Sequence, residues 1–240
     1  MIHVVPMSGG KDSTATALWL NEHEPRDYQY ICTPTGNELP DWYDHMRALS
    51  ATLGKSIVPV IGGTLKGIIA QEQMIPNWRA RFCTRMLKLD PFAAWLMRHT
   101  PAVIYVGLRA DEAEREGGDY RRVPDVVVRF PLRELGWGES DVYAFLDQRG
   151  QRIPERTDCA WCFFQTLGEW WVLWSEYLPL YMEAEQIEIE RGHTFRSPQR
   201  DSWPTSLRDL RLAFESGRVP PRTALQRDLF RGLQCRVCRG

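Results

Sequence analysis

Residues 4–20 read VVPMSGGKDSTATALWL and join a short apolar run to a helix-like pattern through a turn with two glycines. Glycines let backbone N–H groups approach a ligand closely, and the first turn of a helix carries partial positive charge. Lys11 adds a full positive charge to this turn, and Ser8 and Ser13 add hydroxyl donors. The combination predicts an anion site, and a phosphate group is the ligand that would use it.

The composition is that of an ordinary globular protein. The 240 residues are 43% hydrophobic and 25% charged, which suits one large domain or one domain with an appendage. No stretch approaches the roughly 20 consecutive apolar residues that a membrane helix needs. The N-terminus also lacks the pattern of a signal peptide, so we expect no membrane association and a cytoplasmic location.

The net charge of −1 gives no general attraction to nucleic acid or membrane, but the charge is unevenly distributed. Residues 191–240 contain eleven arginines and four acidic residues, a net charge of +7. Such a region could bind the phosphates of a nucleic-acid substrate. The alternative is a set of exposed helices whose arginines are simply solvated.

Short apolar runs alternate with amphipathic patterns over the first part of the chain. We expect strands at residues 2–7, 28–33, 56–61, 102–108 and 126–130, and helices at 12–21, 40–53, 84–99 and 139–148. Pro91 predicts that the third of these helices is kinked or divided into two pieces. This alternation predicts an α/β fold with a doubly wound, mostly parallel sheet and right-handed crossovers.

Strand patterns stop beyond about residue 150. Residues 165–189 are rich in tryptophan and helix-like, and shorter helices are expected at 205–217 and 223–231. We therefore predict an α/β domain over residues 1–150 and a mainly helical, cysteine-bearing extension over residues 151–240.

The opening turn is not a Walker loop, because the G-x-x-x-x-G-K-[ST] spacing is absent. Residues 8–13 instead resemble the S-G-G-x-D-S pyrophosphate loop of the N-type ATP pyrophosphatases, or adenine nucleotide alpha hydrolases. The resemblance implies the fold of that family. It also implies a loop that grips the β- and γ-phosphates of ATP while the α-phosphorus is attacked, which yields an adenylylated substrate and pyrophosphate. The alternative is a glycine-rich turn without a ligand.

Five further stretches resemble segments of the phosphoadenosine phosphosulfate (PAPS) reductase-like superfamily, in the order of that superfamily. They are TPTGNELPDW at 33–42, RFCTRMLKLDP at 81–91, GLRADEAERE at 107–116, FPLRELGWGESDVYAFL at 130–146 and DCAWCFFQ at 158–165. Two positions depart from the pattern. Pro34 stands where aspartate is usual, and Leu135 stands where tryptophan is common.

The resemblance implies a nucleotide site assembled from these stretches. Its residues are Ser8, Gly9, Gly10, Lys11, Asp12, Ser13, Thr35, Gly36, Arg81, Lys88, Gly107, Arg109, Glu112 and Arg115. Lys11, Asp12 and Arg109 are the expected catalytic residues, with Asp12 positioning Mg²⁺ beside the phosphates. Cationic side chains there would stabilise the charge that develops on the phosphates during transfer, although each arginine could instead form a surface ion pair.

Within the superfamily, the intact loop favours enzymes that use ATP. The reductases are known for a degenerate loop and a catalytic cysteine in an E-C-G-L-H tail, whereas this chain ends LQCRVCRG. The resemblance therefore points toward the small subunit of ATP sulfurylase and, above all, toward the iron–sulfur DNA-phosphorothioation pyrophosphatase. A PAPS or adenylyl-sulfate reductase with Cys235 or Cys238 as nucleophile is the first alternative. A non-catalytic ATP-binding subunit with a structural metal is the second.

Four of the six cysteines form two C-x-x-C pairs, Cys159 with Cys162 and Cys235 with Cys238. Each pair can place two thiolates on one metal or cluster. The resemblance implies that Cys83, Cys159, Cys162 and one tail cysteine hold a [4Fe–4S] cluster. The alternative is a zinc site formed by the two pairs, with Cys83 free, and the spacing alone allows both.

The function predicted from the sequence is an ATP pyrophosphatase that binds Mg·ATP, adenylylates a substrate and releases pyrophosphate for sulfur transfer or nucleic-acid modification. The candidate partners are ATP, a nucleic-acid substrate, a sulfur-donor protein and a second copy of the chain.

Overall fold

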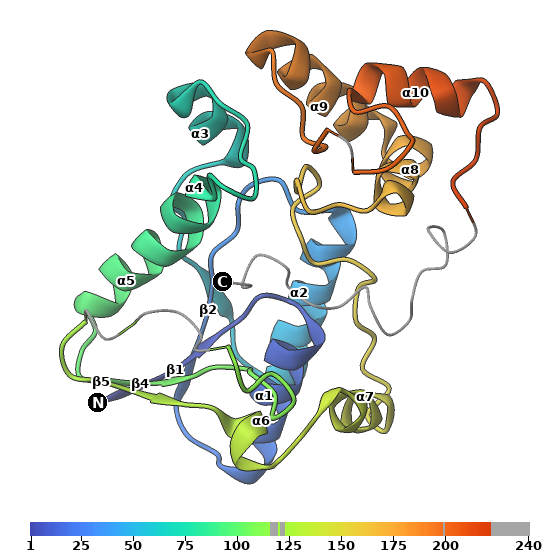
Figure 1. The fold of residues 1–240 in the computed structure, drawn as a ribbon. Coiled ribbons are helices and arrows are strands. Elements are labelled where there is room, and N and C mark those ends of the chain that lie inside the picture. The colour runs from blue at the N-terminus through green and yellow to red at the C-terminus, as the bar shows by residue number, and fades with distance from the viewer. Residues whose placement is uncertain (116–119, 121–122, 199, 222–240) are drawn as a thin grey trace.

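The computed structural model describes residues 1–115, 120, 123–198 and 200–221. Within them, the central feature is a five-stranded parallel sheet with the order β3-β2-β1-β4-β5 (Figure 1). The strands are β1 (Ile2–Pro6), β2 (Tyr28–Cys32), β3 (Ile57–Pro59), β4 (Ala102–Tyr105) and β5 (Val126–Arg129). The predicted doubly wound α/β fold is confirmed.

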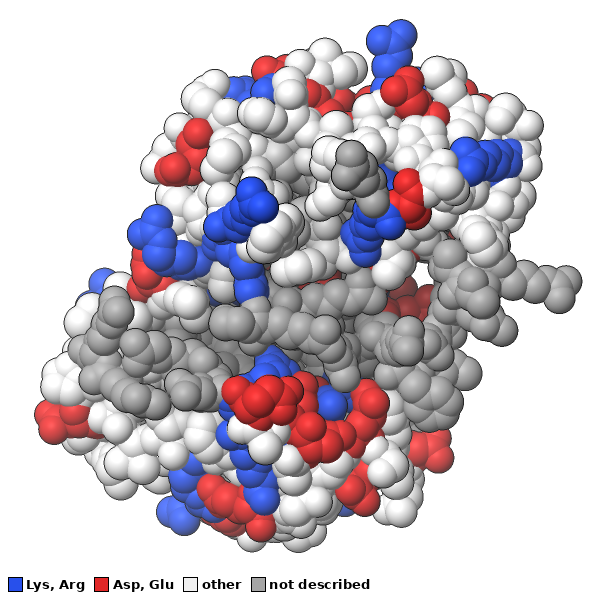
Figure 2. All heavy atoms as spheres, viewed as in Figure 1, with Lys and Arg blue, Asp and Glu red and all other residues white. Residues whose placement is uncertain are grey.

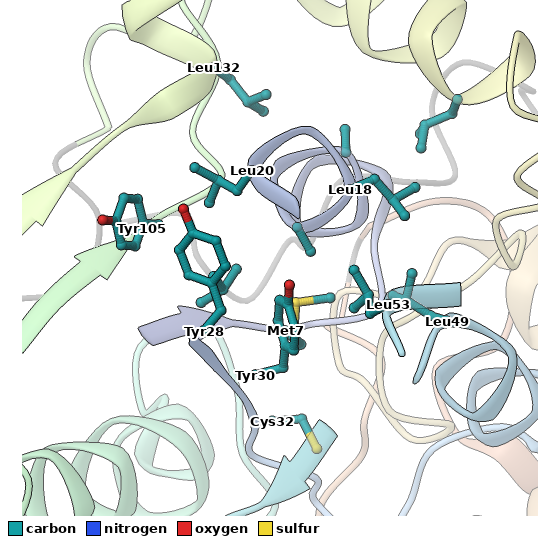
Figure 3. Packing of buried hydrophobic residues seen from close by; sticks show 14 of the residues in the cluster. Met7, Leu18, Leu20, Tyr28, Tyr30, Cys32, Leu49, Leu53, Tyr105 and Leu132 are labelled. Carbon is teal, nitrogen blue, oxygen red and sulfur yellow. The ribbon is translucent and has the colours of Figure 1, made fainter. Parts of the chain in front are cut away.

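Alternate residues of the strands supply two different hydrophobic cores, because successive side chains of a strand point to opposite faces. In β4, Val103 and Tyr105 belong to one core, and Ile104 belongs to the other. Figure 3 shows the first core, in which Leu20 and Tyr28 pack between a helix and the sheet. Both faces of the sheet are therefore covered, as the apolar strands require.

The first core is covered by α1 (Lys11–His23), α2 (Pro40–Leu53), α6 (Pro131–Glu134) and α7 (Glu139–Asp147), since α1 contacts the other three helices. The opposite face is covered by α5 (Asp90–Met97), whose Phe92 and Leu96 pack with Ile31 and Ile104 of the sheet. The observed bounds of α2 coincide with the predicted ones.

The predicted helix at 84–99 is divided in the structure. A short helix, α4 (Phe82–Thr84), leads into a π-helical turn, η1 (Arg85–Leu89), and α5 then begins at Asp90. Pro91 lies in the first turn of α5, where its missing N–H costs no helical hydrogen bond. The irregularity therefore precedes the proline instead of following it.

The part of the chain described after residue 150 is helical, as predicted, and consists of α8 (Leu167–Glu176), α9 (Leu178–Arg191) and α10 (Leu207–Glu215). The expected single helix at 165–189 is two helices, because Pro179 cannot continue a preceding helix but fits the start of a new one. Residues 223–231, the last predicted helix, lie outside the described residues. Every helix within the described residues falls short of what a membrane span requires.

Figure 1 shows α8, α9 and α10 gathered to one side of the sheet. The hydrophobic core of these three helices is shared with the rest of the chain, because it includes Leu87 of η1 and apolar residues of α3 (Leu65–Glu72). Helix α3 was not among the predicted helices. Leu87, Trp170 and Tyr181 are at most 1% exposed in this shared core. The extension thus depends on residues from the first 150 for its packing.

Glu188 of α9 connects the helices of the extension. Its Oε1 accepts a hydrogen bond from the backbone N–H of Phe195 at 2.8 Å, and its Oε2 accepts one from Leu207 at 2.6 Å. The side chain is buried, and burial raises the pKa of Glu188 from its ordinary 4.5 to about 7. Glu188 thus holds the start of α10 at the cost of burying a carboxylate.

This burial predicts a pH dependence of stability. The folded state binds the proton of Glu188 more tightly than the unfolded state, so the free energy of unfolding falls as pH rises from about 4.5 to about 7. Relative to Glu188→Gln, the wild type should lose on the order of 3 kcal/mol over this range. Urea unfolding at several pH values measures it, and Glu190→Gln, an exposed change on the same helix, should keep the wild-type dependence. Parallel curves for wild type and Glu188→Gln would contradict the assignment.

Candidate nucleotide site and cysteine pocket

The turn between β1 and α1 is held in shape by its own serines. Ser13 Oγ donates to the carbonyl oxygen of Gly10 at 3.0 Å and lies 3.0 Å from Ser8 Oγ. Ser8 Oγ also accepts from the N–H of Gly10 at 3.3 Å. The turn is therefore preorganised, which lowers the entropic cost of binding a ligand there.

Gly9 is required by the packing of this turn. It has a φ of +83°, and a Cβ at this position would lie 2.5 Å from Nε1 of Trp42. The same Nε1 donates to the carbonyl oxygen of Ser8 at 2.9 Å. Trp42 of α2 therefore supports the turn, a role that no motif or spacing in the sequence indicates.

Gly107 brings the loop after β4 onto the first turn of α1. A Cβ at Gly107 would lie 2.8 Å from the backbone oxygen of Asp12 and 2.9 Å from Oγ1 of Thr16. Because β2 and β4 lie on opposite sides of β1, the loops after β1 and β4 meet where the strand order reverses. In open α/β sheets this crevice is where ligands bind.

Lys11, Asp12 and Arg109 lie together at this crevice. Lys11 Nζ is 3.2 Å from Oδ2 of Asp12, and Arg109 Nη1 is 3.0 Å from the same oxygen. Lys11 also pairs at 3.3 Å with Glu139, the first residue of α7. Asp111 completes the network, since it accepts from Arg109 Nε at 2.8 Å and from the N–H of Glu139 at 3.1 Å.

The network buries its charges deeply. Lys11 is fully buried and Arg109 is 2% exposed, so each needs carboxylate partners to offset the loss of hydration. Burial raises the pKa of Asp12, against the opposing effect of the neighbouring Lys11 and Arg109. Asp12 Oδ1 is buried and has no hydrogen-bond partner within the described residues. A carboxylate oxygen is a hard ligand, so Oδ1 of Asp12, beside the turn at residues 8–13, is suited to bind Mg²⁺.

Glu112 and Arg115 form an outer part of the same group. Glu112 lies 3.7 Å from Arg109 and also pairs with Arg115. Arg133 of α6 donates to the backbone oxygens of Arg109, Glu112 and Arg115 and so fixes the loop that carries them. Arg133 and Glu139 both lie in the quoted stretch at 130–146, but their roles depend on partners that are distant in sequence.

A second group of predicted residues surrounds a narrow pocket. Thr35, Cys83, Lys88, Cys159 and Cys162 all line it, together with Phe163 and Phe164. Arg81 lies at the same place, with its guanidinium 5.4 Å from the centre of the Phe164 ring. The structure thus divides the predicted nucleotide contacts, because Thr35, Arg81 and Lys88 lie at the cysteine pocket and not in the Lys11 network.

The cysteine segment is pinned to the loop after β2. Glu38 and Cys159 form an isolated antiparallel bridge, and Asn37 accepts from the N–H groups of Ala160 at 2.6 Å and Trp161 at 3.0 Å. Glu38 also accepts from the N–H and the hydroxyl of Thr35, each at 2.7 Å. Asn37 and Glu38 were not among the predicted site residues, although both lie in the quoted stretch at 33–42.

The thiols of the pocket are protonated at neutral pH unless they bind a metal. Burial raises the pKa of Cys159 to about 11 and the pKa of Cys162 well above its usual value. Burial also raises the pKa of Cys83, although the nearby Thr84 and Lys88 act in the opposite direction. Cys32, by contrast, lies in the first hydrophobic core, as a small apolar residue would.

The donor chemistry of the pocket fits the soft metals that thiolates bind, because three cysteines face one cavity. Within the described residues, however, no three metal-ligating side chains are close enough together to hold an ion. Cys235 and Cys238, the remaining predicted ligands, lie outside the described residues. The donor set therefore suits both a cluster and zinc, while the geometry is not that of an assembled metal site.

Comparison with known proteins identifies the family. The profile of the phosphoadenosine phosphosulfate reductase domain matches residues 2–170, which include both the Lys11 network and the Cys159–Cys162 pair. The chain belongs to this family. Comparison with curated protein sequences gives no match.

Two solved structures are similar to this chain. One is a PAPS reductase from Candida auris in a phosphate complex, with 16% identity and a TM-score of 0.49 over 65% of this chain and 76% of that one. The other is the U34-tRNA thiolase NcsA from Methanococcus maripaludis with its [4Fe-4S] cluster, with 16% identity and a TM-score of 0.50 over 99% of this chain and 80% of that one. At this level of identity, the similarity to the thiolase shows the fold alone.

The ion pair between Lys11 and Glu139 predicts a competition with bound anions. Glu139→Gln removes one of the carboxylates that hold Lys11, so pyrophosphate should bind about fivefold more tightly, as expected for the loss of one nearby negative charge. Titration calorimetry with pyrophosphate measures this. Asp147→Asn removes the same charge from the exposed far end of α7 and should leave the affinity within about twofold. Weaker or unchanged binding to Glu139→Gln would rule the competition out.

Proposed function

We propose that this protein is an ATP pyrophosphatase that adenylylates an acceptor and releases pyrophosphate as the first half of a sulfur-transfer reaction. The observation that carries the proposal is the turn at residues 8–13, which is preorganised, rich in donors and located where the strand order reverses. Buried Lys11 and Arg109 converge there on one carboxylate, Asp12. Such an arrangement suits a ligand that carries several negative charges.

In this proposal, the backbone N–H groups of the turn and Lys11 bind the β- and γ-phosphates of ATP. Phosphate oxygens take the place of Glu139 as partners of Lys11. An acceptor oxygen attacks the α-phosphorus, a new O–P bond forms, and the bond from the α-phosphorus to the bridging oxygen breaks as pyrophosphate leaves. Arg109 stabilises the negative charge that develops, and Asp12 would hold Mg²⁺, which would neutralise part of the phosphate charge when bound.

The cysteine pocket supports the second half of the reaction. A sulfur nucleophile would attack the acceptor carbon that bears the adenylylated oxygen. The bond between that carbon and oxygen would break as AMP leaves. A [4Fe–4S] cluster would be held by Cys83, Cys159, Cys162 and a tail cysteine, and its charge would tune the pocket in which the sulfur reacts. This fits a fold shared with a cluster-bearing tRNA thiolase. The sulfur would come from a donor protein, and the enzyme would act in the cytoplasm. A zinc site remains the alternative use of the two cysteine pairs.

The family supports a second candidate, a reductase of PAPS or adenylyl sulfate. A tail cysteine would then attack the sulfur of the sulfonucleotide, and a thiol reductant would release sulfite. In the metal-free state the described cysteines of the pocket are poorly suited to this role, because burial raises the pKa of each thiol. Sulfite formation in the presence of thioredoxin would favour the reductase over the pyrophosphatase.

The phosphate turn predicts the effect of removing Lys11. Lys11→Ala should lower the rate of pyrophosphate release from ATP by 100-fold or more, on the order expected for the loss of a group that stabilises phosphate charge. The measurement is a coupled pyrophosphate assay with ATP and RNA, DNA or sulfate as acceptor. Lys55→Ala, which removes a partly exposed lysine after α2, should keep the wild-type rate. Failure of the wild type to bind a non-hydrolysable ATP analogue would sink the proposal.

Substitution of Cys83 distinguishes the [4Fe–4S] cluster from the zinc site, because only the cluster uses Cys83 as a ligand. Anaerobically purified protein should be brown with about four irons per chain if a [4Fe–4S] cluster is present, or colourless with about one zinc if the two pairs form a zinc site. Cys83→Ala should abolish iron binding in the first case and leave zinc in the second. Cys32→Ala, a change in the hydrophobic core, should retain the metal in both. Iron that survives Cys83→Ala would contradict the proposed ligand set.

A further inference from the structure

A hydrogen-bonded turn at residues 77–80, which directly precedes Arg81 and Cys83 in the chain, presents an exposed tryptophan. Asn77 Oδ1 accepts from the backbone N–H groups of Arg79 at 2.9 Å and Ala80 at 3.0 Å, and the backbones of Asn77 and Ala80 bond to each other in both directions. Trp78 lies at the tip of this turn and is 60% exposed. A rigid turn that holds an indole ring in solvent provides a preformed surface for stacking.

Arg79 accompanies Trp78. Its guanidinium carbon lies 4.6 Å from the centre of the indole ring, a cation–π geometry in which Trp78 stays largely exposed. No carboxylate in the described part of the chain lies within ion-pair distance of Arg79. An exposed arginine without an acidic partner and beside an exposed ring is suited to an anionic, flat ligand.

The chain that follows the turn continues the positive charge toward the pocket. Residues 78–88 contain Arg79, Arg81, Arg85 and Lys88 and no acidic residue. The side chain of Arg85 is 67% exposed, and its carboxylate partner Asp90 is itself exposed and 3.6 Å away, so this pair is weak. Figure 2 shows basic side chains on the face of the molecule around α4, the short helix that lies between Arg81 and Arg85 in the chain.

Aromatic rings continue the same path into the pocket. Phe163 and Phe164 line it with ring centres 4.3 Å apart, and both are partly exposed. Arg81, two residues after Arg79 in the chain, lies over the ring of Phe164 and so connects the turn to the aromatic side chains of the pocket. Base faces stack on aromatic side chains and backbone phosphates bind arginines, and unpaired nucleotides present both groups at once.

We propose that Trp78, Arg79 and Arg85 form the docking surface for a single-stranded nucleic-acid segment, which is the acceptor of the reaction. This inference rests on the proposed function, because it names the substrate class of the same site. A base-paired duplex offers no free base face to Trp78, so pairing excludes the stacking part of the interaction. The surface would recognise unpaired bases by stacking and phosphates by charge, without base-specific contacts.

The test is fluorescence anisotropy of the full-length protein with a labelled 12-nucleotide RNA, the DNA of the same sequence, and the corresponding duplexes. We expect Trp78→Ala to weaken binding of the unpaired strand by at least tenfold and Trp78→Phe to retain most of the affinity. Arg79→Ala and Arg85→Ala should each weaken it severalfold and reduce its salt dependence by about one phosphate contact. Arg98→Ala, an exposed arginine at the end of α5, should stay within about twofold.

Two results would overturn the inference. One is equal affinity of wild type and Trp78→Ala for the unpaired strand, and the other is a duplex that binds as tightly as the unpaired strand. An absence of all oligonucleotide binding would also reject it and would favour a protein partner for the exposed tryptophan. The comparison of RNA with DNA identifies which strand the surface prefers.

Binding of a non-hydrolysable ATP analogue, measured on the same samples without oligonucleotide, separates this inference from the proposed function. Trp78→Ala should leave analogue binding unchanged, while Lys11→Ala should abolish it and leave oligonucleotide binding intact. Oligonucleotide binding without analogue binding in the wild type would reject the ATP-dependent function and leave the docking surface. Analogue binding without oligonucleotide binding would reject the docking surface alone.

Discussion

The contact between the loop after β4 and the first turn of α1 is the constraint on which the site depends. Only a glycine at position 107 lets the two backbones approach closely enough for Arg109 to reach Asp12. Buried charges cost several kcal/mol each unless they are paired, so the network is stable only while Lys11, Asp12 and Arg109 remain together. The backbone approach and the charge pairing therefore stabilise each other, and both lie at the reversal of strand order.

Much of the fold could be predicted from the sequence because its signals are local. Apolar runs marked the five strands, and the bounds of α2 follow from Pro40 at its start and Gly54, with a φ of +64°, just after its end. The break between α8 and α9 was missed because the aromatic pattern continues across it, although Pro179 does interrupt the helix. Short α3 has too few turns for its periodicity to stand out.

The candidate site was predictable as a set of residues but not as an arrangement. The motif at residues 8–13 predicts Lys11 and Asp12 as candidates, whereas the partner of Lys11 in the structure, Glu139, is set by the packing of α7 on α1. The division of the predicted contacts between the Lys11 network and the cysteine pocket also follows from tertiary packing. Residues that act by holding backbones, such as Asn37 and Arg133, have no spacing rule that would reveal them.

The loop after β2 has one further consequence for the molecule. Within six residues, the loop after β2 contacts the cysteine segment through Asn37 and Glu38, and the first turn of α2 supports the turn at residues 8–13 through Trp42. A displacement of residues 37–42 would therefore alter the contacts with both the cysteine segment and the turn at residues 8–13. If a ligand at the turn changes the affinity of the cysteine pocket by displacing this segment, thermodynamic linkage requires the reverse effect by the same factor. Binding of sulfur at the pocket and binding of nucleotide at the turn would then each change the affinity for the other.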